Sequence, residues 1–501
     1  MNPMKNNETN QIKRGAVISY LAITVSLLSG LLYTPWMVKQ IGVNDYGLYT
    51  LASSLISVFL IDFGISEAVS RFISKYNAEG DQNKVNDFLG LIYKLYILID
   101  FVILTVLIIL YFFIPMIYSE LTSGEIEKFK IIFIITSTFS IISLPFVTLN
   151  GILTSYEKFI TLKLCELIHK LLILTLMVGA LMLGFKLYAL VLVNAFAGIF
   201  LIFIKLLYIR RYLPVKVHFK FWDRTLLKEI FSFSVWATVI SIANRFIFNI
   251  TPSILGAVAG SEQIAIFGIA STLEGYAYII SGAINGMFLP KISRIITKNE
   301  DSGSVLPLMI KVGRFQYIII GLIFVGFSIV GKEFVCLWMG DGFEAAYYGA
   351  ILMMLPGVFR VPQQIASVTI IAMNKVKMQA LVYVGVAILN VLLSTIFSSY
   401  FGTLGAAISI CIVYFIRLII MNVIYYKVLH INVFQFFKNC YADMAPPMVL
   451  TLLAGIFMNH LFPYYSITGF VMKGTFIVIL YIILMWKLSL NHYEKSFIKI
   501  F

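Results

Sequence analysis

Long apolar runs separated by short polar segments fill the chain almost from end to end. About twenty consecutive apolar residues are enough to cross a bilayer as a helix, and longer runs fit with some tilt. The pattern predicts about fourteen membrane-spanning helices and an all-α polytopic membrane protein. The expected spans are 15–38, 48–70, 88–113, 129–153, 164–183, 187–208, 229–256, 264–288, 307–330, 345–372, 379–400, 404–426, 446–462 and 465–486.

Lysine and arginine are concentrated in alternate loops between these spans. The connector after the sixth span, for example, carries Arg210, Arg211 and Lys216, whereas the loop before the fourth span carries Glu120 and Glu125. Basic loops stay on the cytoplasmic side of a membrane. With an even number of spans, we therefore expect both termini to be cytoplasmic.

The composition agrees with a chain that lies mostly within the membrane. Hydrophobic residues make up 60% of the 501 residues and charged residues 12%, about half of the roughly 25% found in soluble domains. The basic inner loops, which face anionic headgroups of membrane lipids, account for the net charge of +14 without nucleic acid. Four scattered cysteines predict neither a metal site nor a disulfide framework, and no motif for a cofactor is present.

A short polar turn between two spans recurs along the chain. Gly42 in "IGVNDYGLYT" and Gly260 in "AGSEQIAIFG" are 260 − 42 = 218 residues apart, and the same offset links Gly184 to Gly402. The spacing between Pro145 and Pro362 differs from this offset by one residue. A repeat of this length, containing an even number of spans, predicts two parallel bundles with a cleft between them. The expected domains are a six-helix bundle at 10–215, a second at 228–430 and an extra helix pair at 440–490.

The first half contains "IGVNDYGLYTLASSLISVFLIDFGISEAVSRFISKY". The "YGLY" turn followed by the "DFG" helix resembles the polysaccharide-transport branch of the MOP exporter superfamily, which includes the Wzx-type O-antigen and capsule flippases. The resemblance implies a flippase in the bacterial inner membrane. Its substrate would be undecaprenyl-diphosphate-linked oligosaccharide, moved from the cytoplasmic to the outer leaflet by alternating access, with or without coupling to H⁺ or Na⁺. The pathway would also supply partners such as a polysaccharide polymerase.

Several basic residues at membrane depth are candidates for binding a diphosphate. Charges inside spans are costly, and they usually face a cavity or a partner. Arginine bonds phosphate oxygens in a bidentate manner, so we predict a cationic cavity. Its expected members are Arg245, Arg360, Arg417, Lys311 and Arg314. The alternative is that these residues form structural pairs, such as Arg360 with Glu274 or Arg417 with Asp100.

Acidic residues at membrane depth are candidates for ion coupling. A carboxylate in a cleft of low dielectric can exchange protons as access alternates. Asp62, Asp100 and Glu274 lie near the middle of their expected spans. The counterparts of Asp62 and Arg71 in the second half are Ile280 and Leu289. We therefore expect the two halves to differ in function.

Other functions remain possible from the sequence. A lipid II flippase has the same number of spans, whereas a multidrug or cation antiporter would have about twelve and an acidic cavity. A polymerase would need a large outer loop and a glycosyltransferase a large extramembrane domain. Neither is present, so we predict no enzymatic activity and no catalytic residue.

Overall fold

The computed structural model describes residues 23–59, 64–282, 292, 295–296, 302–373, 375–462, 466–492 and 494–495. Every regular element within these residues is a helix, which confirms the expected all-α membrane fold. The chain divides into two compact units, Met1–Ala265 and Ile266–Phe501.

Three helices of the first unit, which start at residues 82, 123 and 224, begin at polar side-chain caps and continue through apolar runs. Asp81 accepts a hydrogen bond from the Lys84 amide at the start of α4, and Thr122 and Glu125 form a reciprocal capping box at the start of α5. After a helix over 23–41, the elements are α2 (Val43–Phe59), α3 (Ile65–Ala78), α4 (Gln82–Ile117), α5 (Ser123–Ser143), η1 (Leu144–Val147), α6 (Thr148–Ser155), α7 (Phe159–Met182), α8 (Leu187–Tyr212), α9 (Arg224–Phe248) and α10 (Thr251–Val258).

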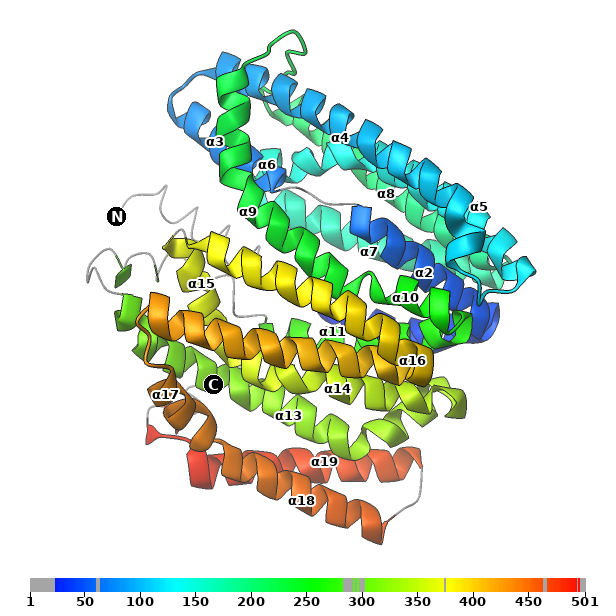
Figure 1. Cartoon of the computed structure of the whole chain (residues 1–501), viewed down its shortest axis with the longest axis vertical. Helices are drawn as coiled ribbons and strands as arrows, with labels where there is room; N and C mark the ends of the chain where they lie inside the picture. The colour runs from blue at the N-terminus through cyan, green and yellow to red at the C-terminus, as the bar shows by residue number, and fades with distance from the viewer. Residues whose placement is uncertain are drawn as a thin grey trace. The chain divides into compact units, whose positions relative to one another are not determined.

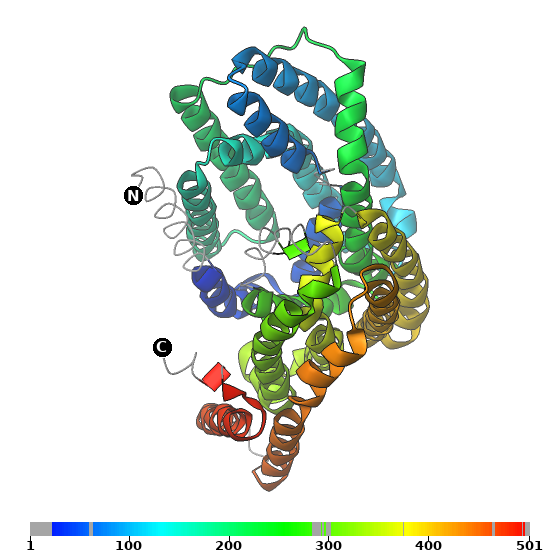
Figure 2. The ribbon, with the colours of Figure 1, turned by 90° about the vertical axis from the view of Figure 1, so that its left-hand side faces the viewer.

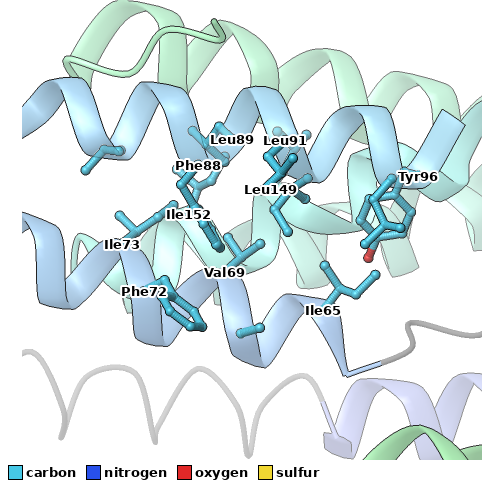
Figure 3. Packing of buried hydrophobic residues seen from close by; sticks show 14 of the residues in the cluster. Ile65, Val69, Phe72, Ile73, Phe88, Leu89, Leu91, Tyr96, Leu149 and Ile152 are labelled. Atoms are coloured by element: carbon cyan, nitrogen blue, oxygen red, sulfur yellow. The ribbon is translucent and has the colours of Figure 1, made fainter. Parts of the chain in front are cut away.

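The core of the first unit lies between α3, α4 and α6. Figure 3 shows Val69 and Phe72 of α3 facing Phe88 of α4 and Ile152 of α6. The Phe72 and Phe88 rings stack with their centroids 5.2 Å apart. A Cβ on Gly151 would lie 2.6 Å from the carbonyl oxygen of Ser66, so only glycine allows α6 to approach α3 this closely.

The second unit carries most of the α11 helix and the rest of the chain. In Figures 1 and 2, α18 and α19 lie beside each other, and both pack on α13. The elements are α11 (Ser261–Gly282), η3 (Ser302–Val305), α13 (Leu306–Met339), η4 (Asp341–Phe343), α14 (Glu344–Arg360), η5 (Val361–Gln363), α15 (Gln364–Ala372), α16 (Val376–Val428), α17 (Val433–Phe436), η6 (Phe437–Ala442), α18 (Ala445–Leu461), α19 (Ile467–Leu484) and η7 (Met485–Ser489).

Ten helices of the described residues are long and apolar enough to cross a membrane, or eleven if a bent pair at Val433–Leu461 forms one span. The expected number of about fourteen is therefore not confirmed. The expected spans 15–38 and 48–70 both include residues outside the described part of the chain. Two further expected spans are joined in α16, whose 53 residues would extend about 80 Å, more than twice the thickness of a bilayer core.

A sharp turn interrupts α16 where the sequence predicts a loop. Gly402 has φ 53° and ψ −129°, which is not helical. A Cβ on Gly405 would lie 2.0 Å from the carbonyl oxygen of Phe397, so the chain folds back on itself here. Figure 1 shows the yellow and orange parts of α16 running side by side.

The positions related by the offset of 218 residues share their backbone conformation. Gly42 and Gly260 have φ of 91° and 85°, and Gly184 and Gly402 have φ of 83° and 53°, values that favour glycine. Pro145 lies in η1, between α5 and α6, and Pro362 lies in η5, between α14 and α15. These similarities support the predicted repeat. The contact boundary at Ala265 differs from the expected domain limits, which remain a prediction.

Candidate functional site

Three charged residues of the second unit, of which Glu274 and Arg417 are buried and Arg360 is half-buried, gather around three tyrosine rings. Glu274 and Tyr278 lie one helical turn apart on α11, and Arg360 is the last residue of α14. Arg417 belongs to the second part of α16. The remaining members, Tyr383 and Tyr414, lie on the two parts of α16. We refer to these six residues as the arginine–tyrosine cluster.

Each guanidinium group of the cluster packs against two rings. Arg360 Cζ lies 4.4 Å from the centroid of the Tyr278 ring and 5.6 Å from that of Tyr414. Arg417 Cζ lies 4.5 Å from the centroid of the same Tyr414 ring and 4.7 Å from that of Tyr383. A desolvated cation–π contact stabilises by about 2 kcal/mol. Tyr414 therefore links the two cations.

The cluster contains more positive than negative charge. Neither Arg360 nor Arg417 forms an ion pair within 4 Å in the described part of the chain. Glu274 interacts electrostatically with Arg360 but forms no ion pair with it within 4 Å, and its buried Oε1 has no hydrogen-bond partner among the described residues. The buried Nε of Arg360 likewise has no hydrogen-bond partner among the described residues. Two cations and one carboxylate leave one uncompensated positive charge, which is costly at membrane depth unless an anion binds.

The break in α14 positions Arg360. Pro356 lies inside α14, and Pro362 follows in η5, so the helix ends at Arg360 and the chain continues as α15. A Cβ on Gly357 would lie 2.5 Å from the Tyr278 hydroxyl oxygen. Glycine at this position therefore allows Tyr278 to approach α14 and to lie against Arg360.

Arg314 is not a member of the cluster, although the sequence places it in the cationic cavity. Its Nε donates to Glu494 Oε1 at 2.6 Å, and its terminal nitrogens donate to the carbonyl oxygens of Asn439 and Ser489. Arg314 is 5% exposed and Glu494 is 2% exposed. Protein acceptors already take up the hydrogen-bond donors of this guanidinium group. Arg314 therefore connects α13 to the segment around Glu494 and has a structural role.

Replacing Glu494 by glutamine is expected to destabilise the fold by about 3 kcal/mol, because it removes the buried counter-ion of Arg314 and leaves the exposed Asp443, 3.6 Å away, as its one acidic partner among the described residues. Thermal unfolding in detergent would measure the effect. Glu79→Gln is the matched control. It removes a carboxylate from the exposed Lys84 pair, where about 0–1 kcal/mol is expected. Equal stability of the two variants would contradict the structural role of Arg314.

The other two basic candidates are Arg245 and Lys311. Arg245 is near the end of α9 in the first unit, where its Nη1 donates to the carbonyl oxygen of Ser57 in α2. Lys311 is exposed near the start of α13. Of the four expected members of the cationic cavity that lie in the second unit, Arg360 and Arg417 pack on a common ring, that of Tyr414.

For neither acidic candidate of the first half does the structure describe a partner. Asp62 lies outside the described residues. Asp100 lies in α4, and its buried Oδ1 has no hydrogen-bond partner among the described residues. Glu274 is the one acidic candidate that the structure places beside a cationic candidate. No group of three or more histidine, cysteine or acidic side chains in the described residues is suited to a metal ion.

A second feature of the first unit is the contact between the two repeated turns. A Cβ on Gly47, at the start of α2, would lie 2.0 Å from the carbonyl oxygen of Ser261, at the start of α11. The Ser261 hydroxyl group donates to the Glu125 carboxylate at 2.5 Å, and the Asn44 side chain is hydrogen-bonded to the same carboxylate. Glu125 of α5 therefore connects both turns.

Further polar contacts surround this junction. The Tyr118 hydroxyl group lies 2.7 Å from that of Ser253 in α10, and Lys128 donates to Asp45 at 2.6 Å. We refer to Asn44, Gly47, Tyr118, Glu125, Ser253 and Ser261 as the turn junction. It holds the start of the second repeat against the first repeat at one end of the first unit.

Two parts of these sites have no local signal in the sequence. Tyr383 stacks on Arg417 from the preceding part of α16, 34 residues earlier. Glu494 pairs with Arg314 across 180 residues. Both partners are set by packing between helices, which short sequence spacings do not encode. The aromatic residues Tyr278 and Tyr414 are predictable, because they lie within one turn of Glu274 and Arg417 in apolar spans.

Comparisons with known proteins agree with this architecture. Residues 12–296 match the family described as "Polysaccharide biosynthesis protein". The chain is 24% identical over 221 residues to a protein of Shigella flexneri named "Putative O-antigen transporter", a match covering 43% of this chain and 50% of that protein. It is 23% identical over 189 residues to a Haloferax volcanii protein named "Probable low-salt glycan biosynthesis flippase Agl15", covering 36% and 38%. The matches thus span half or less of these relatives.

Solved structures of transporters share the fold. A lipid II flippase, MurJ, in an inward closed conformation matches with a TM-score of 0.74 at 15% identity, covering 94% of this chain and 97% of that one. An inward-facing multidrug resistance transporter of the MATE family in the MOP superfamily matches with a TM-score of 0.67 at 12% identity, covering 81% and 96%. At these identities the likeness concerns the fold alone.

Proposed function

This chain belongs to the family of polysaccharide biosynthesis proteins, and from that membership we propose that it is a lipid-linked oligosaccharide flippase. The substrate is undecaprenyl-diphosphate-linked oligosaccharide, an O-antigen or capsule repeat unit. The protein moves it from the cytoplasmic to the outer leaflet of the bacterial inner membrane without covalent chemistry. Both termini lie in the cytoplasm, as the basic loops require.

The arginine–tyrosine cluster is the observation that carries this proposal. A diphosphate must cross the low-dielectric interior with counter-charges, and the cluster has one positive charge in excess. Arg360 and Arg417 present planar donor groups that fit phosphate oxygens. Arg360 is partly exposed and meets the substrate first. Arg417 is 4% exposed, so it reaches the diphosphate only after the surrounding helices separate.

The turn junction supports alternating access. The positive-inside rule puts the turns at Gly42 and Gly260 on the outer side. In the proposed cycle this junction keeps the outer side closed, and its opening would release the substrate outward. We assign the junction to the outer gate of the transport cycle.

Glu274 is the coupling residue in this scheme. A diphosphate bound to Arg360 would compete with the Glu274 carboxylate for the positive charge and would favour its protonation. H⁺ or Na⁺ could then be exchanged as access alternates. Asp100 and Asp62 of the first half are the second candidates for this role.

The proposal is tested by translocation in proteoliposomes. Diphosphate-linked oligosaccharide is placed in both leaflets, and a membrane-impermeant glycosidase digests the sugar that becomes exposed. Wild-type protein is expected to expose the protected fraction, with acceleration by an imposed pH or Na⁺ gradient that Glu274→Gln removes. Protein-free liposomes are the control. If lipid II is moved and the oligosaccharide lipid is not, the chain is a lipid II flippase; if soluble cations are moved instead, it is an antiporter.

A further inference from the structure

Two apolar grooves lie at the end of the second unit where α16 ends. The first, of about 680 Å³, runs between the second part of α16 and α17, and its walls include Ile419, Val423 and Val433. The second, of about 490 Å³, runs between α14, η6 and α18, and its walls include Tyr317, Met448 and Leu452. Ile419 and Val423 are 63% and 48% exposed, so the first groove opens on an apolar surface of a membrane protein.

The grooves are separated by a common wall. Phe359, at the end of α14, and Phe437, at the start of η6, line both grooves. The Tyr441 hydroxyl group, which borders the second groove, donates to the carbonyl oxygen of Phe359 and holds this wall in place. Two apolar channels divided by one wall fit two hydrocarbon chains better than a single one.

Each groove contains one lysine. Lys427, in the last turn of α16, borders the first groove, and Lys438 of η6 borders the second. Both lysines are exposed, and neither forms an ion pair within the described residues. Lysines of this kind place the apolar stem along a hydrocarbon surface and the ammonium group at the headgroup level. The charge and the shape together fit an anionic headgroup that carries two chains.

We propose that the two grooves bind one molecule of an anionic two-chain phospholipid. One acyl chain occupies each groove, on either side of Phe359 and Phe437, and the phosphate group lies between Lys427 and Lys438. The lipid then contacts the residue adjacent to Arg360, at the end of the helix that positions this arginine. This site concerns a bulk membrane lipid and is independent of the proposed transport substrate.

Native mass spectrometry of the full-length protein tests the proposal, with phosphatidylglycerol titrated against phosphatidylcholine. A basic residue near the membrane surface adds about fivefold to the affinity for an anionic lipid. The double variant Lys427→Gln/Lys438→Gln is expected to bind phosphatidylglycerol about 30-fold more weakly and phosphatidylcholine as before. Lys487→Gln is the matched control, since Lys487 is exposed in η7 and lines neither groove, and it should change binding less than twofold.

A second variant tests the grooves themselves. Val423→Trp places a large ring in the first groove and is expected to weaken binding of both phospholipids. The proposal is overturned if the double lysine variant binds phosphatidylglycerol like wild type. It is also overturned if undecaprenyl phosphate displaces phosphatidylglycerol from wild type, because the grooves then hold a single polyprenyl chain. None of these outcomes depends on translocation, so they do not decide the proposed transport function.

Discussion

Replacing both Arg360 and Arg417 by alanine is expected to lower the rate of translocation about 1000-fold. Each guanidinium group makes charge-assisted hydrogen bonds to the diphosphate in the proposed complex, and such contacts contribute about 2 kcal/mol each. Two contacts give about 4 kcal/mol, and each 1.4 kcal/mol corresponds to a factor of ten. The glycosidase assay in proteoliposomes measures the rate.

Lysine variants separate substrate binding from packing. Arg360→Lys/Arg417→Lys keeps the charge but loses the planar, bidentate donors, so an intermediate loss of about tenfold is expected. Arg224→Ala, at the exposed first residue of α9, should remain within twofold of wild type. Thermal unfolding is measured for every variant. A folded double alanine variant that transports at the wild-type rate would exclude the cluster from the substrate path.

Replacing Gly47 by valine is expected to abolish transport, at least 100-fold below wild type. The Cβ would lie 2.0 Å from the Ser261 carbonyl oxygen, and real Cβ atoms stay about 1 Å further away. The obstacle is backbone, so no side-chain rotation relieves it, and the two turns must separate. The outer gate would then not close, and the cycle would stop with its outer side open.

Thiol labelling reports the state of the gate directly. In a background without the four native cysteines, Ser261→Cys is expected to react slowly with a membrane-impermeant reagent, because Ser261 is 5% exposed. Adding Gly47→Val should speed the reaction at least tenfold. Gly124→Val is the matched control, because nothing lies within 4 Å of a Cβ at this glycine of α5. Normal transport by Gly47→Val would refute the gate.

The sequence predicts the local features of the fold well. Apolar runs locate the helices, and the glycines related by the offset of 218 residues mark turns with positive φ. The prolines at 145 and 362 mark broken spans. These features depend on a few neighbouring residues, so a single sequence contains them. The number of spans and the domain limits depend on the whole chain and are not confirmed.

The candidate site is only partly predictable, for a physical reason. A charged residue in an apolar span must have a partner or a cavity, so Glu274, Arg360 and Arg417 are recognisable from their position alone. Which partner each one has is decided by helix packing. Arg314 has the same sequence signal as Arg360, yet it is enclosed by Glu494 and two backbone carbonyl groups, whereas Arg360 faces tyrosine rings.

The most direct test of the central claim is a cryo-EM structure of the full-length protein with undecaprenyl-diphosphate-linked oligosaccharide. The predicted result is a diphosphate whose oxygens lie within about 3 Å of the guanidinium nitrogens of Arg360 or Arg417, with the tyrosine rings displaced from at least one of them. A bound substrate with its diphosphate elsewhere, and with both arginines still packed on Tyr414, would contradict the account.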